Sequence, residues 1–389
     1  MANVGRFFQD PGQSFFLFGP RGTGKSTWLR QKFPQALWLD LLDPGLARSL
    51  LARPDQLRDL LAARPDADTV VVDEVQRVPE LLAVVHQLIE ERRARFVLTG
   101  SSSRKLKRVG VDLLAGRALL RRMSPFLASE LGPAFNLQQA LQLGMLPLVL
   151  DSARPADTLQ SYVALYLREE VQQEGLVRNL GNFARFLEAI SLSQAAVLNL
   201  SEVSRECEVS RKTVEGYLEI LEDLLLSFCL PVFSKRARRK LAAHPKFYLF
   251  DTGVFQSLRP RGPLDAAENV AGAGLEGLVA QHLRAWIELS PDDASLYYWR
   301  TQAGNEVDFV VYGPAGFWAV EVKHSGVVHS ADLNGLKAFA EDYPEARLVM
   351  LYRGRQRLRR GGVDCIPVED FLRQLRPGQG LLQAPGPPP

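Results

Sequence analysis

The sequence predicts an α/β protein in which a parallel sheet is followed by a helical region and then by a smaller α/β region. Three observations lead to this prediction. Short apolar runs alternate with helical patterns from residue 14 to about residue 123, which favours a parallel sheet covered by helices on both faces. From about residue 155, apolar residues recur at the three-to-four spacing of helices. Mixed strand and helix patterns return from about residue 275.

The first region contains five expected strands, with helical patterns at residues 25–33 and 79–92 between some of them. The strands are expected over residues 15–18, 37–41, 70–73, 96–99 and 118–123. In open sheets of parallel strands a ligand lies at the carboxyl ends of the strands. Polar motifs that follow a strand directly are therefore the first candidates for a site.

One such motif separates the first expected strand from the first helix and fits the phosphate-binding pattern G-x-x-x-x-G-K-[ST] at every fixed position. Glycines let backbone N–H groups close around phosphate oxygens, and the helix N-terminus adds partial positive charge. A glycine-rich turn that matches by chance is disfavoured by the flanking strand and helix. The motif predicts the P-loop NTPase fold. Its residues are Gly19, Pro20, Arg21, Gly22, Thr23, Gly24, Lys25 and Ser26.

Residue types in this loop suggest separate roles. Lys25 is expected to reach the β- and γ-phosphates, and the Ser26 hydroxyl is expected to hold Mg²⁺. A second segment, residues 69–74, is an apolar run that ends in two carboxylates, as a strand buried on both faces does. Asp73 is then expected near the metal, and Glu74 is placed to orient and deprotonate the attacking water. Two solvated carboxylates at a strand end are the alternative.

Together these motifs predict an ATPase that needs ATP and Mg²⁺. No N-K-x-D motif for reading guanine is present, so adenine is the expected base. Thr99 and Ser101 follow the next strand and are candidates for sensing the γ-phosphate. A plain polar turn is the alternative there.

Size and composition set the expected organisation. A chain of 389 residues suggests two or three domains, expected at 1–150, 151–262 and 263–376 with a disordered tail at 377–389. The chain is 46% apolar and 23% charged, with a net charge of +3, which is too small to imply nucleic acid by itself. Three scattered cysteines, no secretory signal and no apolar run near ~18 residues predict a cytoplasmic protein with no membrane partner.

The helical region contains a pattern that resembles helix-turn-helix. Helices are expected over 201–208 and 211–226, with Ser201 and Ser210 as N-caps, and strands over 228–233 and 246–250 could form a wing. Basic residues crowd this wing and could hold phosphates of DNA, although carboxylates on the second helix oppose such contact. A winged helix that contacts protein is the alternative. The basic residues are Lys235, Arg236, Arg238, Arg239 and Lys240.

A second candidate site lies in the last region, where residues 256–274 read as a linker before a helix over 275–289. Side chains two residues apart on a strand share a face, which pairs Glu306 with Asp308 and Glu321 with Lys323. Asp308 and Glu321 could hold Mg²⁺, with Lys323 stabilising charge on a phosphate and Glu276 adding a fourth acid. This D…E-x-K pattern suggests a metal-dependent nuclease, and unrelated surface charges are the alternative.

The whole chain resembles a prokaryotic family of AAA-related P-loop ATPases that carry a winged helix and a C-terminal domain of unknown function with a PD-(D/E)xK nuclease-like core. The matching stretches are GPRGTGKST (19–27), DEVQRVPEL (73–81), LTGSS (98–102), LAGR (114–117), YLFDTG (248–253), LEGLVA (275–280), YWRTQAGNEVDF (298–309) and VEVK (320–323).

The resemblance implies ATP binding by the loop, Thr27 included, with Lys25, Ser26, Asp73 and Glu74 as its core. It implies a nuclease-like set formed by Glu276, Asp308, Glu321 and Lys323. Arg117 stands where the family has a recurrent arginine that could contact the γ-phosphate in cis or across a subunit. Arg121 and Arg122 compete for that role. Val307 replaces the proline that names the nuclease motif.

Two hypotheses follow. In the first, the chain is an ATPase that acts as a nucleotide-controlled switch on DNA, with a nuclease-like C-terminal domain. In the second, ATP sets the conformation or oligomeric state of a regulatory module that has no nuclease activity. A homo-oligomer is left open by both hypotheses.

Overall fold

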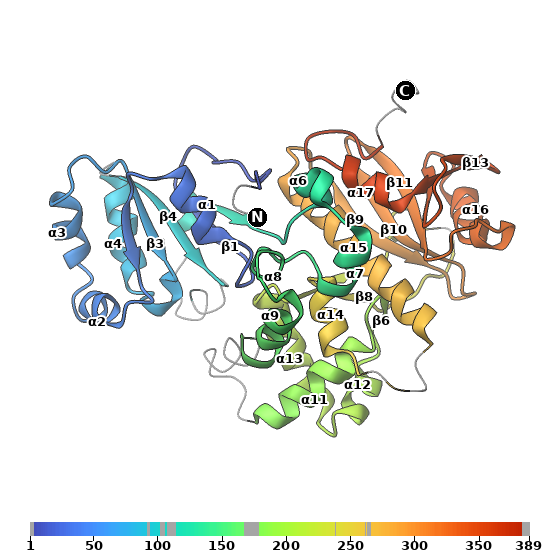
Figure 1. Cartoon of the computed structure of the whole chain (residues 1–389), viewed down its shortest axis with the longest axis horizontal. Coiled ribbons are helices and arrows are strands. Elements are labelled where there is room, and N and C mark those ends of the chain that lie inside the picture. The colour runs from blue at the N-terminus through green and yellow to red at the C-terminus, as the bar shows by residue number, and fades with distance from the viewer. Residues whose placement is uncertain are drawn as a thin grey trace. The chain divides into compact units, whose positions relative to one another are not determined.

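The computed structural model describes residues 4–91, 94–101, 106, 114–166, 179–237, 239–260, 262 and 266–382, and the chain forms two compact units (Figure 1). The smaller unit comprises Phe8–Pro125 and Ile220–Leu226, and the larger unit comprises the rest of the chain. The division therefore falls at residue 125, not at the expected residue 150. The reason is that Phe126, Leu131 and Phe135 are buried in the hydrophobic core of the larger unit.

The smaller unit is built on a five-stranded sheet in the order β2-β3-β4-β1-β5, and each neighbouring pair is parallel. This confirms the predicted parallel sheet. The strands are β1 (Phe15–Phe18), β2 (Leu37–Asp40), β3 (Thr69–Asp73), β4 (Arg95–Gly100) and β5 (Leu119–Arg122). The helices are α1 (Lys25–Lys32), α2 (Pro44–Ala52), α3 (Gln56–Ala62), η1 (Val75–Arg77), α4 (Leu81–Glu90) and η2 (Leu114–Gly116).

Both faces of this sheet are covered, as the continuous apolar runs of β1 and β3 require. Phe16 and Val72 lie in one cluster with Leu50 of α2 and Leu81 of α4. The alternate residues, such as Phe15, point to the other face and are equally buried. On that face the ring of Phe8 lies between Phe15 and Trp28 of α1.

The larger unit begins as a group of helices, so the predicted helical region is confirmed. Asn199, and not the expected Ser201, caps α12, because the Asn199 side chain accepts the Glu202 N–H. Ser210 does cap α13, since its hydroxyl accepts the Thr213 N–H. The helices are α6 (Ala128–Leu131), η3 (Gly132–Ala134), α7 (Leu137–Leu143), α8 (Pro147–Leu150), α9 (Pro155–Ser161), η4 (Tyr162–Tyr166), α11 (Leu180–Ser191), α12 (Leu200–Glu206) and α13 (Arg211–Asp223). The last turn of α13, from Ile220 on, is assigned to the smaller unit.

Two sheets follow in the larger unit. The first has the order β6-β8-β7, with antiparallel strands β6 (Ala196–Val197), β7 (Ser227–Leu230) and β8 (Lys246–Leu249). The second has the order β13-β14-β12-β11-β10-β9. Its strands are β9 (Ser295–Arg300), β10 (Glu306–Gly313), β11 (Gly316–Lys323), β12 (Arg347–Tyr352), β13 (Leu358–Arg360) and β14 (Val363–Pro367). Its helices are α15 (Ala267–Leu289), η5 (Ser330–Leu333), α16 (Asn334–Asp342) and α17 (Val368–Gln374).

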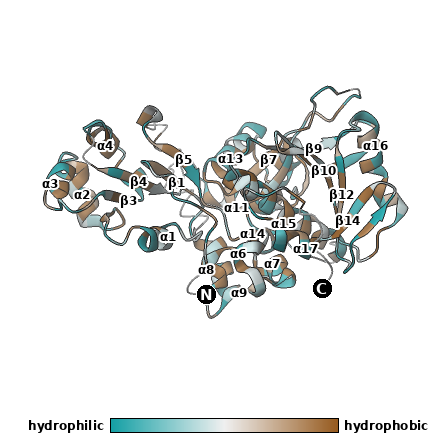
Figure 2. Cartoon of the chain, turned by 90° about the horizontal axis from the view of Figure 1, so that it is seen from above, coloured by the Kyte–Doolittle hydropathy of each residue, from teal (hydrophilic) through white to brown (hydrophobic). Residues whose placement is uncertain are grey.

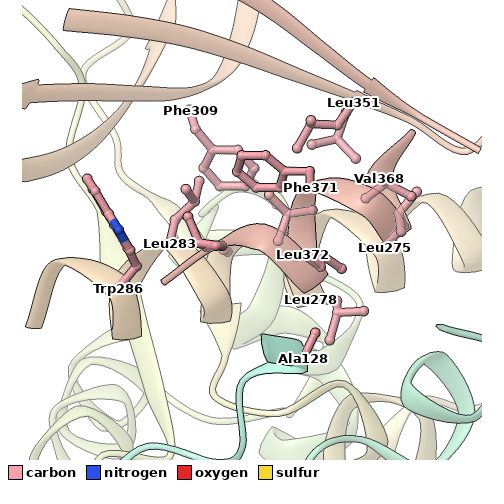
Figure 3. Close-up of a cluster of buried hydrophobic side chains, with 14 of the residues drawn as sticks. Ala128, Leu275, Leu278, Leu283, Trp286, Phe309, Leu351, Val368, Phe371 and Leu372 are labelled. Atoms are coloured by element: carbon pink, nitrogen blue, oxygen red, sulfur yellow. The ribbon is translucent and has the colours of Figure 1, made fainter. Parts of the chain in front are cut away.

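Helices α15 and α17 cover one face of this second sheet. Figure 3 shows Phe371 and Leu372 of α17 beside Leu283 of α15, with Phe309 of β10 and Leu351 of β12 above them. In Figure 2 the strands of this sheet are predominantly brown, whereas the helices carry brown and teal faces. Burial of these apolar faces is what holds the larger unit together.

Two sequence expectations about the ends of elements are wrong. Residues 256–274 are not all linker, since α14 (Thr252–Leu258) runs into the segment and α15 already begins at Ala267. The tail expected to be disordered from residue 377 is ordered in its described part, because Leu381 is 3% exposed and lies in the core of the larger unit. Residues 383–389 lie outside the described residues.

Asp251 and His282 fix the helical layer through buried hydrogen bonds. Asp251 caps α14 and also accepts the Met145 N–H, which ties the start of α8 to α14. Burial raises the pKa of Asp251 to about 6, against the opposing effect of its three backbone donors. His282 Nδ1 lies 2.8 Å from the Leu278 carbonyl and therefore donates, so Nε2 is the acceptor for the Ala128 N–H.

We predict that His282 makes the larger unit less stable in acid. Burial lowers the pKa of His282 to about 4. The unfolded chain therefore binds the proton more readily, and the contribution that is complete above about pH 6.5 is lost as the pH falls toward 4. The free energy of unfolding of the larger unit is measured in urea at several pH values. In the His282→Gln protein it should fall by roughly 3 kcal/mol less between pH 6.5 and pH 4 than in the wild-type protein.

His244→Gln, at an exposed position in the same unit, controls for the loss of a histidine. An unaltered pH dependence in the His282 variant would show that the ring does not contribute in this way.

Candidate functional site

The glycine-rich loop between β1 and α1 has the backbone that its sequence predicts. Gly22 and Gly24 have φ angles of 82° and 88°, in the left-handed region that favours glycine. Gly19 is required for a different reason, because a Cβ there would lie 2.4 Å from the Met123 carbonyl oxygen. Thr23 closes the turn by donating its hydroxyl to the Pro20 carbonyl at 2.9 Å.

The loop presents the N-terminus of α1. Gly24 is the N-cap of α1 and supplies no capping side chain. The N-terminal amides of α1 can therefore receive an anion. Lys25 Nζ is buried and donates to the carbonyls of Gly19 at 2.7 Å and Pro20 at 3.2 Å. Arg21 is half-buried in the loop, and Thr27 is exposed on the first turn of α1.

Asp73 at the end of β3 meets two hydroxyl groups. The Ser26 hydroxyl donates to Asp73 Oδ2 at 2.7 Å, and the Thr99 hydroxyl donates to Asp73 Oδ1. Asp73 is 5% exposed, so this carboxylate is held in place by its partners. A hydroxyl beside a carboxylate is the oxygen pair that Mg²⁺ uses in phosphate-loop sites, and these residues therefore fit the ion. The structure thus brings together the predicted Lys25, Ser26 and Asp73.

Glu74 adopts a left-handed backbone with φ of 60°, which is unusual for a residue that is not glycine. Its carboxylate accepts the Gln76 Nε2 amide at 2.5 Å, and the same amide lies 3.4 Å from Ser101 Oγ. Gln76 is 8% exposed and was not among the predicted site residues. The sequence feature that could have indicated Gln76 is its position two residues after Glu74. Ser101 thus contacts Gln76, and Thr99 contacts Asp73.

Arg117 lies at the opposite edge of the sheet from the phosphate loop. It precedes β5, whose first residue Leu119 pairs with Phe15 at the start of β1. The loop follows the other end of β1, roughly 10–13 Å away along the strand. Arg117 forms an ion pair with Glu90 at the end of α4. In this structure Arg117 therefore does not serve the loop of its own chain. Arg122 pairs with Phe18 and lies at the loop's edge.

The second candidate site has a different centre from the one expected. Glu276 and Asp308 do come together, but they do so around the ammonium of Lys246 on β8. Glu306 joins them, and Glu321 pairs with Lys323 at 2.7 Å, so the predicted pairing of side chains along each strand is confirmed. Among the described residues, no group of three or more His, Cys, Asp or Glu side chains is arranged to hold a metal ion.

Burial dominates the ionisation of this acidic cluster. It raises the pKa of Glu276 to about 7 and that of Glu321 to about 8, and the nearby Asp308 carboxylate adds to both shifts. Burial disfavours the charged form of Lys246, but Asp308 and Glu276 outweigh it and raise the pKa of Lys246 well above its usual range. Lys246 was not among the predicted site residues, because in the sequence it resembles an ordinary residue at the start of a strand.

Two of the basic residues expected on a wing, Lys235 and Arg239, have partners within the larger unit. Lys235 Nζ lies 4.3 Å from the centre of the Tyr312 ring. Arg239 pairs with Glu341 at 2.5 Å and with Asp342 at 3.1 Å. Arg236 and Lys240 are exposed, and Arg238 lies outside the described residues. The expected positive surface is therefore partly neutralised.

Comparison with known proteins divides the chain into three matches. Residues 12–132 match the family model of an AAA domain. Residues 134–265 and 271–371 match two domains of unknown function, DUF8612 and DUF4143. The first match covers the five-stranded sheet and the phosphate loop, and with their geometry it supports an AAA-type P-loop domain. Such a domain implies nucleotide binding.

The names of the relatives found by sequence comparison state no activity. Uncharacterized proteins of Mycobacterium bovis and Mycobacterium tuberculosis are each 27% identical over 369 residues, which covers 92% of this chain and 80% of theirs. Among solved structures, the replication initiator DnaA bound to AMPPCP and single-stranded DNA matches with a TM-score of 0.25 and 11% identity. That match covers 54% of this chain and 82% of the other. In the described part of the chain, no helix is long and apolar enough to cross a membrane.

We predict that Arg117→Ala leaves the rate of ATP hydrolysis within about two-fold of the wild-type rate. An arginine that stabilises the transition state contributes about 10³–10⁵-fold to turnover. The position of Arg117 beside Glu90, away from the loop, excludes such a role within one chain. Steady-state ATPase measurements at several protein concentrations test this. A loss of a hundred-fold or more would show that Arg117 reaches a phosphate, for instance across a subunit.

Proposed function

We propose that this protein binds ATP with Mg²⁺ at the loop of residues 19–27 and hydrolyses it. The observation that carries the proposal is the hydrogen bond of 2.7 Å between Ser26 Oγ and Asp73 Oδ2. It joins the first turn of α1 to the end of β3, two elements that are far apart in sequence. The AAA domain match over residues 12–132 supports the same assignment.

Each residue of the site has a role in this proposal. Amides of the loop and Lys25 would bind the phosphates, and Ser26 and Asp73 would hold the metal. When bound, Mg²⁺ would neutralise charge on the phosphate oxygens. Glu74 would take the proton of the attacking water, and Gln76 would orient the Glu74 carboxylate through their hydrogen bond. Thr99 fixes the orientation of Asp73.

We predict that Lys25→Ala abolishes ATP binding, because the phosphates lose their buried cation. Glu74→Gln should retain binding and lose about 10²–10⁴-fold in turnover, because the amide cannot accept the proton. Binding is measured by calorimetric titration with Mg-ATP, and turnover by release of inorganic phosphate.

Lys32→Ala, at the exposed end of α1, and Glu80→Gln, at the exposed N-cap of α4, are the matched controls. Both should behave like the wild-type protein. Normal turnover in the Glu74→Gln protein would exclude Glu74 as the base.

For the larger unit we propose a regulatory module whose binding of a partner depends on the nucleotide state. The chain passes between the units at residues 7–8, 125–126, 219–220 and 226–227, so the two units are covalently connected at four points. A metal-dependent nuclease formed by Asp308, Glu321 and Lys323 is the competing hypothesis. It is disfavoured because Asp308 and Glu276, two of the expected metal ligands, instead form ion pairs with the ammonium of Lys246.

DNA remains the partner that we propose for this module, on the basis of the two helices α12 and α13 and the exposed cations that follow β7. We predict that the double variant Arg236→Ala/Lys240→Ala binds duplex DNA more weakly than the wild-type protein does. The loss of affinity should be the same for DNA duplexes of unrelated sequence. In a plot of log affinity against log salt concentration, the slope should become shallower by about 2, one unit for each lost phosphate contact.

The double variant Lys337→Ala/Arg347→Ala removes the same charge from exposed positions on α16 and β12. It should bind DNA as the wild-type protein does. Equal affinity of all three proteins would rule out the segment after β7 as the DNA contact.

A further inference from the structure

The acidic cluster of the larger unit consists of Glu276, Glu306, Asp308 and Glu321, and Lys246 lies within it. The ammonium of Lys246 lies 2.6 Å from Glu276 Oε1, 2.7 Å from Glu306 Oε1 and 3.0 Å from Asp308 Oδ1. These three acids come from α15 and β10, whereas Lys246 comes from β8 of the other sheet. Lys246 Nζ donates hydrogen bonds to Glu306 and Asp308, and it forms an ion pair with Glu276.

Other polar groups also contact the carboxylate oxygens of the cluster. Asp308 Oδ2 accepts the Val322 N–H at 2.9 Å, and Glu306 Oε2 pairs with Arg300 at 3.2 Å. Tyr248 donates its hydroxyl to Glu276 Oε1 at 2.6 Å. Glu321 Oε1 pairs with Lys323, and its buried Oε2 has no hydrogen-bond partner among the described residues.

This arrangement does not fit a divalent metal. A metal ion would need oxygens within about 2.0–2.6 Å of a common point, with six or more ligands for Ca²⁺ and near-octahedral geometry for Mg²⁺. The common point of three carboxylates is instead filled by a nitrogen atom, at hydrogen-bond distances. The Lys246 side chain is 3% exposed, so it has no space to swing into solvent without moving β8.

We infer that Lys246 is the resident cation of this acidic cluster and takes the place of a divalent metal, so that the larger unit is a metal-independent module. The inference deepens the proposal of a regulatory module and is independent of ATP hydrolysis. Lys246 also links β8 to α15 and β10, which would make the ion-pair cluster a fixed joint between the two sheets. Removing the ammonium would leave the largely buried Glu276 and Asp308 without their counter-ion, whereas Glu306 would keep its pair with Arg300.

The test compares wild-type protein with Lys246→Met, in which a neutral side chain of similar length replaces the lysine. Thermal unfolding is recorded without nucleotide over a range of MnCl₂ concentrations. We expect the melting temperature of Lys246→Met to be lower than that of the wild type and to rise by several degrees with Mn²⁺, because the ion replaces the lost charge. The wild-type protein and the double variant Lys246→Met/Asp308→Asn should show no such rise.

A second measurement applies if Lys246→Met does not fold. Mn²⁺ binding to folded wild-type protein and to Asp308→Asn is counted by electron paramagnetic resonance, again without nucleotide. The inference requires the same number of bound ions in both proteins. One ion fewer in Asp308→Asn would overturn it, and so would Mg²⁺- or Mn²⁺-dependent cleavage of plasmid DNA that Lys323→Ala abolishes. Neither outcome would affect the ATPase proposal, because Ser26 and Asp73 lie in the other unit.

Discussion

The hydrogen bond between Ser26 and Asp73 is the interaction on which the account of the smaller unit depends. It fixes the first turn of α1 against the carboxyl end of β3, and Thr99 of β4 holds the other oxygen of the same carboxylate. Three elements are thereby fixed around one buried acid. A phosphate site needs this preorganisation, because donors that must be reoriented on binding reduce affinity and catalysis.

The direction of the strands sets a second constraint. All five strands of the sheet are parallel, so every residue that follows a strand lies at one edge and every residue that precedes one lies at the other. Glu74 and Ser101 belong to the loop's edge, whereas Arg117 belongs to the opposite edge, where Glu90 neutralises it. A motif next to a strand in sequence is therefore expected near the phosphate loop only when it follows the strand, and not when it precedes it.

The two sites differ in how far sequence could predict them. The phosphate loop is local, since residues 19–26 fold on one another and need only β1 and α1 for context. The cluster around Lys246 is not local, since its acids come from residues 276–321 and its cation lies upstream of them on another sheet. Strand alternation correctly paired Glu306 with Asp308, but no periodicity shows which side chain fills the space between them. Gln76 was missed because a polar residue after a strand reads as solvated.

The errors in element boundaries have similar causes. Small residues near Ala267 and Gly274 suggested a linker, yet tertiary packing continues α15 through them. Leu381 looked like part of a polar tail, but its side chain is buried in the core.

Equilibrium binding of Mg-ATP to the purified wild-type chain, measured by calorimetric titration, tests the nucleotide site directly. Saturable binding of one nucleotide per chain, weakened when Mg²⁺ is removed, is the result that the geometry of Ser26 and Asp73 predicts. No measurable affinity for any Mg-nucleotide would contradict the assignment of the loop.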